Sequence, residues 1–217
     1  MRSPSRISAL RAQAESLNID IRGMSKASIV RALRAKEGTL ADLPHPHRVV
    51  GRLGVSGKEG SVFEVRMRNG KCFAKKNFKK TKSAAKLRAE ALLQQQATDA
   101  GLSPRVEEYN LVEKYILMEK LETNLYDLLV RKRGKLSQKI QRDLVRIFRS
   151  LDNIGVFHKD PNPLNFMFDA SGHLKIIDFG FAETISEKKH GKTPNADQMT
   201  LGLCLKLREI FPGVDYA

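Results

Sequence analysis

The chain has 217 residues, a formal net charge of +15 and a hydrophobic fraction of 41%. This length accommodates one compact domain with a small appendage and excludes two full-sized domains, while the apolar fraction excludes disorder along the whole chain. The positive charge predicts attraction to polyanions such as nucleic acid, an anionic membrane or an acidic protein, unless the basic residues only solvate helix faces.

The two cysteines, Cys72 and Cys204, lie among apolar residues, which argues against a disulfide framework and fits a reducing compartment. The first ten residues lack the apolar core of a signal peptide, and no apolar run approaches the roughly 18 residues of a membrane span. We therefore expect a soluble intracellular protein, cytoplasmic or nuclear, with no membrane partner.

Two short helices are predicted at the start of the chain. Apolar residues recur at helical spacing in 7–17 and again in 24–33. The following segment 43–47, Leu-Pro-His-Pro-His, indicates a stiff linker because each proline disfavours helix at the residue before it. The sequence therefore predicts a helical module with its linker over residues 1–44 and a main domain over 45–217.

A β-hairpin is predicted next. Alternating segments over 61–67 and 71–78 are separated by Arg-Asn-Gly, a turn sequence that supplies positive φ at little cost. Ala74 and Lys76 share one face of the second strand, and Lys75 takes the other. On the first face a small residue would border a purine while the ammonium group reaches its phosphates.

Three glycines precede the hairpin at intervals of three residues. Their missing side chains would let backbone N–H groups approach phosphate oxygens, although glycines at this place are also ordinary turn residues. The spacing also departs from the Gly-x-Gly-x-x-Gly pattern of some phosphate-binding loops, with Val55 where the first glycine of that pattern belongs. The residues of this region predicted to contact a nucleotide are Gly54, Gly57, Gly60, Val62, Ala74 and Lys76.

An inward-pointing lysine needs a counter-charge to stay ionised. A helix is predicted over 83–100, and its Glu90 is the natural partner of Lys76; the alternative is a solvated lysine and a surface glutamate. A strand is predicted over 115–119, and further helices follow through residue 153.

The segment His-Lys-Asp-Pro-Asn-Pro-Leu-Asn over 158–165 carries the strongest signal, followed by Ile-Ile-Asp-Phe-Gly over 176–180. Phosphoryl transfer needs a carboxylate that orients the attacking hydroxyl and oxygen ligands that hold Mg²⁺ against the phosphates. Asp160 would meet the first need, and Asn165 with Asp178 the second. The alternative is a chance occurrence of aspartate and asparagine in loops.

These two segments resemble the His-Arg-Asp-x-x-x-x-Asn and Asp-Phe-Gly motifs of protein kinases, and the resemblance extends from about residue 49 to residue 211. It implies a bilobal α+β protein-kinase-like fold, with ATP and Mg²⁺ as cofactors and 158–165 as the catalytic loop. It also implies that Lys76 and Glu90 position the phosphates and that residues 117–121 form the hinge for the adenine edge. The implied hinge contacts are Met118, the gatekeeper, with Glu119 and Leu121.

Within that superfamily, residues 56–59 resemble a loop of the atypical RIO kinases. Residues 162–166 and 177–182 look more like small kinases encoded by large DNA viruses, which would act in a host cell, and the KEOPS kinase is similar in size and layout. Residues 24–34 resemble SAP-like and Rho N-terminal units, which implies nucleic acid as a partner. The alternative is a helical hairpin that only caps the small lobe.

The chain departs from the kinase pattern in several places. Lys159 replaces the catalytic-loop arginine, and Asn162 replaces a lysine that would neutralise the transferring phosphate. Nothing like Ala-Pro-Glu follows Gly180; instead, Asp197 and Gly202 resemble the start of the helix that anchors the catalytic loop. We expect no phosphorylation switch and a truncated C-lobe, whose missing substrate surface a structured partner or a large substrate would supply.

The favoured function is transfer of the ATP γ-phosphate to a serine or threonine hydroxyl of a protein substrate. Two alternatives remain open. One is a RIO- or KEOPS-like ATPase or small-molecule kinase, favoured by the short activation region. The other is a non-catalytic scaffold that the basic module tethers to nucleic acid.

Overall fold

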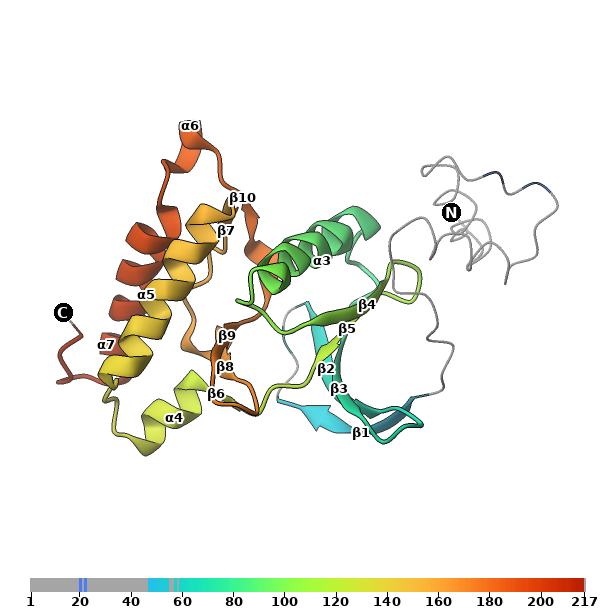
Figure 1. The fold of residues 1–217 in the computed structure, drawn as a ribbon, viewed down its shortest axis with the longest axis horizontal. Helices are drawn as coiled ribbons and strands as arrows, with labels where there is room; N and C mark the ends of the chain where they lie inside the picture. Colours follow the sequence, from blue (N-terminus) through green and yellow to red (C-terminus); the bar gives the residue numbers. More distant parts are fainter. Residues whose placement is uncertain (1–19, 21, 23–46, 55–56, 58, 217) are drawn as a thin grey trace. The chain divides into compact units, whose positions relative to one another are not determined.

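The computed structural model describes residues 20, 22, 47–54, 57 and 59–216, drawn as coloured ribbon in Figure 1. The chain divides into two compact units, residues 1–84 with 107–117 and residues 85–106 with 118–217. The helices predicted within residues 1–44 lie outside the described residues and stay predictions.

A five-stranded sheet in the order β1-β2-β3-β5-β4 forms the first unit. Its strands are β1 (Arg48–Leu53), β2 (Gly60–Arg66), β3 (Cys72–Phe78), β4 (Val106–Asn110) and β5 (Tyr115–Glu119). The predicted hairpin is confirmed, since β2 and β3 pair antiparallel with Val62 opposite Lys76. Its turn closes where Gly70, at a φ of +83°, donates to the carbonyl of Met67 over 3.0 Å.

The apolar centre of this unit is small. Val65, Met67, Tyr115 and Leu117 are buried together, and Phe73 packs against them from β3. The first two come from β2 and the turn, the next two from β5, so the cluster joins strands that are far apart in the sequence. At about 1.5–3 kcal/mol for each fully buried large side chain, this packing holds the sheet together.

The second unit is mostly helical. Its helices are α3 (Ala84–Asp99), α4 (Leu125–Arg131), α5 (Gln138–Asn153), α6 (Glu187–His190) and α7 (Thr200–Ile210). Its short strands are β6 (Thr123–Asn124), β7 (Val156–Phe157), β8 (Phe166–Phe168), β9 (Leu174–Ile176) and β10 (Glu183–Thr184). Single turns form η1 (Pro163–Asn165), η2 (Phe179–Phe181) and the π turn η3 (Asn195–Met199), which runs directly into α7.

Helix α5 is the centre of the second core. Ser137 caps it by accepting from the Ile140 N–H over 3.4 Å, and its apolar residues recur at helical spacing on one buried face. Phe148 on that face meets Phe166 of β8 edge to face, with ring centroids 5.8 Å apart. A sheet-rich unit and a helix-rich unit confirm the predicted α+β kinase-like class. Among the helices that the structure describes, none has the length and apolar character that crossing a bilayer requires.

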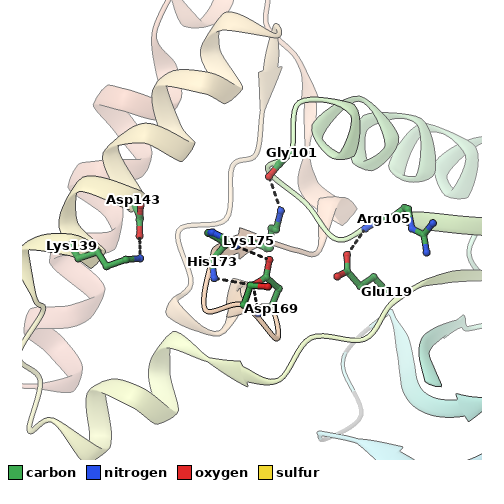
Figure 2. Close-up of polar contacts among 9 residues, drawn as sticks. Gly101, Arg105, Glu119, Lys139, Asp143, Asp169, His173 and Lys175 are labelled. Carbon is green, nitrogen blue, oxygen red and sulfur yellow. Dashed lines mark hydrogen bonds and ion pairs between the residues drawn. The ribbon is translucent and has the colours of Figure 1, made fainter. Parts of the chain in front are cut away.

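Helix α3 is fixed to the other elements of the second unit at its C-terminal end. Figure 2 shows the Lys175 ammonium donating to the Gly101 carbonyl, a contact of 2.9 Å. Beside it, the Ile176 N–H donates to the Leu102 carbonyl, also over 2.9 Å. These bonds tie the end of α3 to β9, the strand that leads into Asp178.

Candidate active site

The catalytic loop folds back on itself through a short capped turn. The side chain of Asn162 accepts from the Leu164 N–H over 3.0 Å, and Pro163 occupies the first position of η1, where its fixed φ suits a helical turn. The turn brings Asn165, which is 7% exposed, back to Asp160: its amide nitrogen donates to Asp160 Oδ2 over 2.9 Å. Two of the predicted site residues are therefore in contact.

Asp178 follows β9 in a left-handed conformation, with a φ of +66°. Its carboxylate accepts from the Gly180 N–H over 3.4 Å, and the next residue, Phe179, is buried with its ring 5.0 Å from that of His158. The Ile177 N–H donates to the Asn165 carbonyl over 2.9 Å. The two predicted metal ligands therefore sit on neighbouring, hydrogen-bonded segments.

This arrangement fits Mg²⁺. Because the Asn165 amide nitrogen is used by Asp160, the amide oxygen is the atom that would face a cation, and Asp178 contributes carboxylate oxygens of the kind Mg²⁺ prefers. Glu90 of α3 is 2% exposed, and one of its carboxylate oxygens lies within 4.8 Å of one from Asp178. Two carboxylates this close repel each other unless positive charge lies near them.

His158 joins the catalytic loop to the segment before Asp178. Its Nε2 lies 3.0 Å from the Ile177 carbonyl oxygen, and complete burial lowers the pKa of the imidazole, so the neutral ring donates this bond. The histidine therefore holds the two predicted halves of the metal site in register.

The helical segment of η3 and α7 anchors the catalytic loop, as expected, and the side chain that makes the anchoring contact is Asn195. Asn195 of η3 is fully buried; its side chain accepts from the His158 N–H over 3.0 Å and donates to the Val156 carbonyl over 2.7 Å. Asp152 of α5 in turn accepts from the Asn195 amide over 2.7 Å. Asp197 is exposed and accepts from the Thr193 hydroxyl over 2.9 Å.

Gly202 places α7 against the catalytic loop. A Cβ at this position would lie 2.7 Å from Cγ of Pro161, so only glycine permits the approach. Lys206, one helical turn further on the same face, holds its ammonium 3.3 Å from Asp160 Oδ1. Sequence reasoning missed this lysine, although the four-residue spacing from Gly202 was a usable signal.

A second strained position lies in the catalytic loop. Lys159 has a φ of +69°, and left-handed backbone at a non-glycine residue costs about 1–3 kcal/mol. Its ammonium donates to the Glu183 carboxylate over 2.9 Å, and Lys189 and His190 contact the same carboxylate. These bonds, the one from Lys159 above all, lower the pKa of Glu183 to about 2.

In the first unit, β3 has the predicted register. Ala74 and Lys76 are buried at 8% and 9% exposure on one face. Lys75 takes the opposite face, with its ammonium 4.0 Å from the centre of the Tyr115 ring and 2.9 Å from Nε2 of His47. Burial lowers the pKa of Lys75. Lys76 is therefore the member of the pair on the predicted nucleotide face, while its pairing with Glu90, a residue of the other unit, stays a prediction.

The glycines before the hairpin have different roles. Gly54 adopts a φ of +67°, and the Gly57 N–H donates to the Gly60 carbonyl over 2.9 Å. A Cβ on Gly60 would lie 2.1 Å from the carbonyl oxygen of Asn77 on β3. The close approach of β3 is therefore enough to explain why residue 60 is a glycine. Phosphate contact by the three glycines and nucleotide contact by Val62 stay predictions.

The predicted hinge contacts, Met118, Glu119 and Leu121, lie where the chain returns to the second unit at residue 118. Met118 and Leu121 are buried, and the Gln94 amide donates to the Met118 sulfur over 3.4 Å. Glu119 and Arg105 exchange two bonds: the Glu119 N–H donates to the Arg105 carbonyl over 2.8 Å, and the Arg105 N–H donates to the Glu119 carboxylate over 3.2 Å, as Figure 2 shows for the latter. Adenine contact by these residues stays a prediction.

Comparison with known proteins agrees with this geometry. Residues 47–201 match the model of the protein kinase domain. Similar segments occur in the probable serine/threonine-protein kinase ndrC of Dictyostelium discoideum (33% identity, 36% of this chain, 6% of the relative) and in mitogen-activated protein kinase 4a of Physcomitrium patens (36%, 42% and 24%). A third is the mitogen-activated protein kinase homolog NTF6 of Nicotiana tabacum (30%, 60% and 33%). The chain thus spans at most a third of the length of each of these three relatives. The match to the family model covers most of the chain, which therefore belongs to the protein kinase domain family.

Proposed function

We propose that this chain is a protein kinase that transfers the γ-phosphoryl group of ATP to a serine or threonine hydroxyl. The observation that carries the proposal is the joint placement of Asp160, Asn165 and Asp178 on hydrogen-bonded segments of one unit. The names of the similar proteins from Dictyostelium and from plants support the protein substrate and, for the first, the serine/threonine preference.

Each residue has a chemical task in this proposal. Asp160, held by the Asn165 amide, orients the acceptor hydroxyl and takes its proton. Asn165 and Asp178 hold Mg²⁺ through their side-chain oxygens, and Lys76 and Glu90 position the phosphates. Bound MgATP supplies the phosphoryl group, and its Mg²⁺ supplies the positive charge that offsets the negative charge on the phosphate oxygens.

Activity in this proposal does not await phosphorylation of the segment between Gly180 and Asp197. The catalytic-loop lysine, Lys159, already has a carboxylate partner in Glu183, which remains ionised far below neutral pH. A phosphate on Thr184, Ser186 or Thr193 would have to compete with that ion pair. Phosphatase treatment should therefore leave transfer unchanged; loss of transfer would identify a switch among those three residues.

The finer assignments belong to the same proposal. We place the chain near the small viral and RIO-type kinases, inside the cell in the cytoplasm or nucleus, with residues 45–217 as the kinase domain and 1–44 as a basic module that contacts nucleic acid. Deleting 1–44 should weaken the binding of nucleic acid and flatten the salt dependence of that binding. ATP turnover should stay intact. A large fall in melting temperature with unchanged nucleic-acid affinity would instead favour a module that caps the small lobe.

Labelled ATP with a cell lysate tests the central claim. Wild type should produce phosphoserine or phosphothreonine, and Asp178→Ala should lose at least about 1,000-fold in rate because a metal ligand contributes several kcal/mol to the transition state. The matched control is Asp143→Ala, which removes a half-buried carboxylate 2.8 Å from the ammonium of Lys139 on α5 (Figure 2). Free phosphate without phosphoprotein would favour the ATPase alternative, and activity in Asp178→Ala would contradict the metal assignment.

A further inference from the structure

The catalytic loop lacks a cation where the kinase pattern has one, at Asn162. The structure gives this asparagine another task, because its side-chain oxygen accepts from the Leu164 N–H and starts η1. A neutral amide engaged in a cap cannot offset the charge that spreads over the transferring phosphoryl oxygens. The chemistry therefore calls for a positive charge from elsewhere near Asp160.

Helix α7 brings a lysine to that place. Gly202 lets the helix approach Pro161, and Lys206 follows by one turn on the same face. Within the described part of the chain, the side-chain hydrogen bonds recorded to the Asp160 carboxylate come from Asn165 at Oδ2 and from Lys206 at Oδ1. An ammonium group has three N–H donors, so one can hold Asp160 while another reaches a phosphoryl oxygen.

Stability alone does not explain this ion pair. The side chains of Lys206 and Asp160 are 40% and 24% exposed, and ion pairs that face water in this way contribute little to folding. Their exposure also leaves the ammonium open to a substrate. The same partial exposure would be a disadvantage for a purely structural contact and is an advantage for a group that meets a ligand.

We propose that Lys206 is a catalytic residue of this kinase, supplying from α7 the cation that the catalytic loop lacks at Asn162. The inference rests on the proposed transfer function and adds a residue to it. In the assisted step, the acceptor oxygen bonds to the γ-phosphorus while the bond from phosphorus to the β–γ bridging oxygen breaks. ADP leaves with that electron pair, the hydroxyl proton passes to Asp160, and the Lys206 ammonium contacts the oxygens of the group in transfer.

Two readouts test the proposal on the full chain. The first is steady-state transfer by Lys206→Ala, Lys206→Arg and the control Arg208→Ala, which removes an exposed cation from the same helix. Lys206→Ala should lower kcat about 10- to 100-fold, the range for one charge-assisted hydrogen bond, at unchanged KM for ATP. Lys206→Arg should recover much of that loss, and Arg208→Ala should behave as wild type.

The second readout is binding without turnover. ADP and Mg²⁺ with aluminium fluoride mimic the planar phosphoryl group, so Lys206→Ala should bind this mixture about 10- to 100-fold more weakly while binding ADP and Mg²⁺ as wild type does. Lys206→Ala matching Arg208→Ala in both readouts would overturn the inference and leave the proposed function standing. A wild-type protein that transfers nothing would overturn both. A fall in melting temperature beside equal losses in Lys206→Ala and Lys206→Arg would assign the lysine a structural role and also overturn it.

Discussion

Asn195→Ala should be among the most destabilising single truncations near the catalytic loop. The substitution removes the acceptor of the His158 N–H and the donor to the Val156 carbonyl, and it takes one donor from the buried Asp152 carboxylate. All of these groups lie in the interior of the second unit. Alanine leaves space but no polar atom at this position. The buried groups that were bonded to Asn195 then lack a partner in the folded protein, whereas in the unfolded chain they bond to water.

The magnitude follows from the groups left without a partner. A buried donor or acceptor that loses its bond costs about 1–3 kcal/mol, so the two backbone groups together give about 2–6 kcal/mol. That is a large part of a total stability of about 5–15 kcal/mol. In a chain of this size each kcal/mol lowers the melting temperature by about 2–4 °C, so we expect a fall of about 5–20 °C.

Urea unfolding and thermal melting of Asn195→Ala measure the effect, with Asp197→Ala as the matched control. Asp197 lies two residues away, is exposed, and contacts Thr193, so its loss should cost less than about 1 kcal/mol. If Asp197→Ala destabilised the protein as much as Asn195→Ala, the burial argument would be refuted.

Further outcomes follow from the other contacts. Lys76→Met should abolish transfer and Lys75→Met should retain most of it in a kinase assay, because the two side chains lie on opposite faces of β3; the reverse result would contradict the nucleotide face. Gly202→Ala should cost about 1–3 kcal/mol in urea unfolding and slow transfer, because its Cβ would press on Pro161; an unchanged stability would show that the loop yields freely. The pKa of Glu183 is lowered from 4.5 to about 2, so its ion pairs stabilise the fold in full above about pH 4.5 and are lost as the pH falls through 2. The difference in unfolding free energy between wild type and Glu183→Gln should therefore shrink as the pH falls through this window. A difference that stays constant would contradict the assignment of these ion pairs.

Much of the first unit could be predicted from local patterns. The expected strands over 61–67 and 71–78 match β2 and β3 within one residue, and the expected strand over 115–119 has the bounds of β5. The alternation of apolar and polar residues and the Asn-Gly turn involve residues that are close together in the sequence. A short window of sequence is therefore enough to predict the hairpin. Strand β1 had no such signal: five of its six residues are exposed, and pairing with β2 is what holds it extended.

The candidate site divides in the same way. Asp160, Asn165 and Asp178 follow each other within a short stretch, and their residue types at that spacing suggest the chemistry. Asn195 and Lys206 act on residues 37 and 46 positions away in the chain, so their roles depend on how η3 and α7 pack. A local pattern does not show these contacts, so the role of Asn195 was not predicted; for Lys206 the sequence offered only its four-residue spacing from Gly202, which places it on the same helix face.

The hydrogen bond from the His158 N–H to a side chain has a consequence for how the second unit opens. An amide bonded within a sheet can exchange its hydrogen when the strand frays, but this one exchanges only when η3 separates from α5 and Asn195 withdraws. Exchange at His158 therefore reports the opening of the helical pair and not of the loop itself. The catalytic loop belongs to the same cooperative unit as these helices, so a partner that clamps α5 to η3 would slow that exchange and preserve the geometry of the loop without touching it.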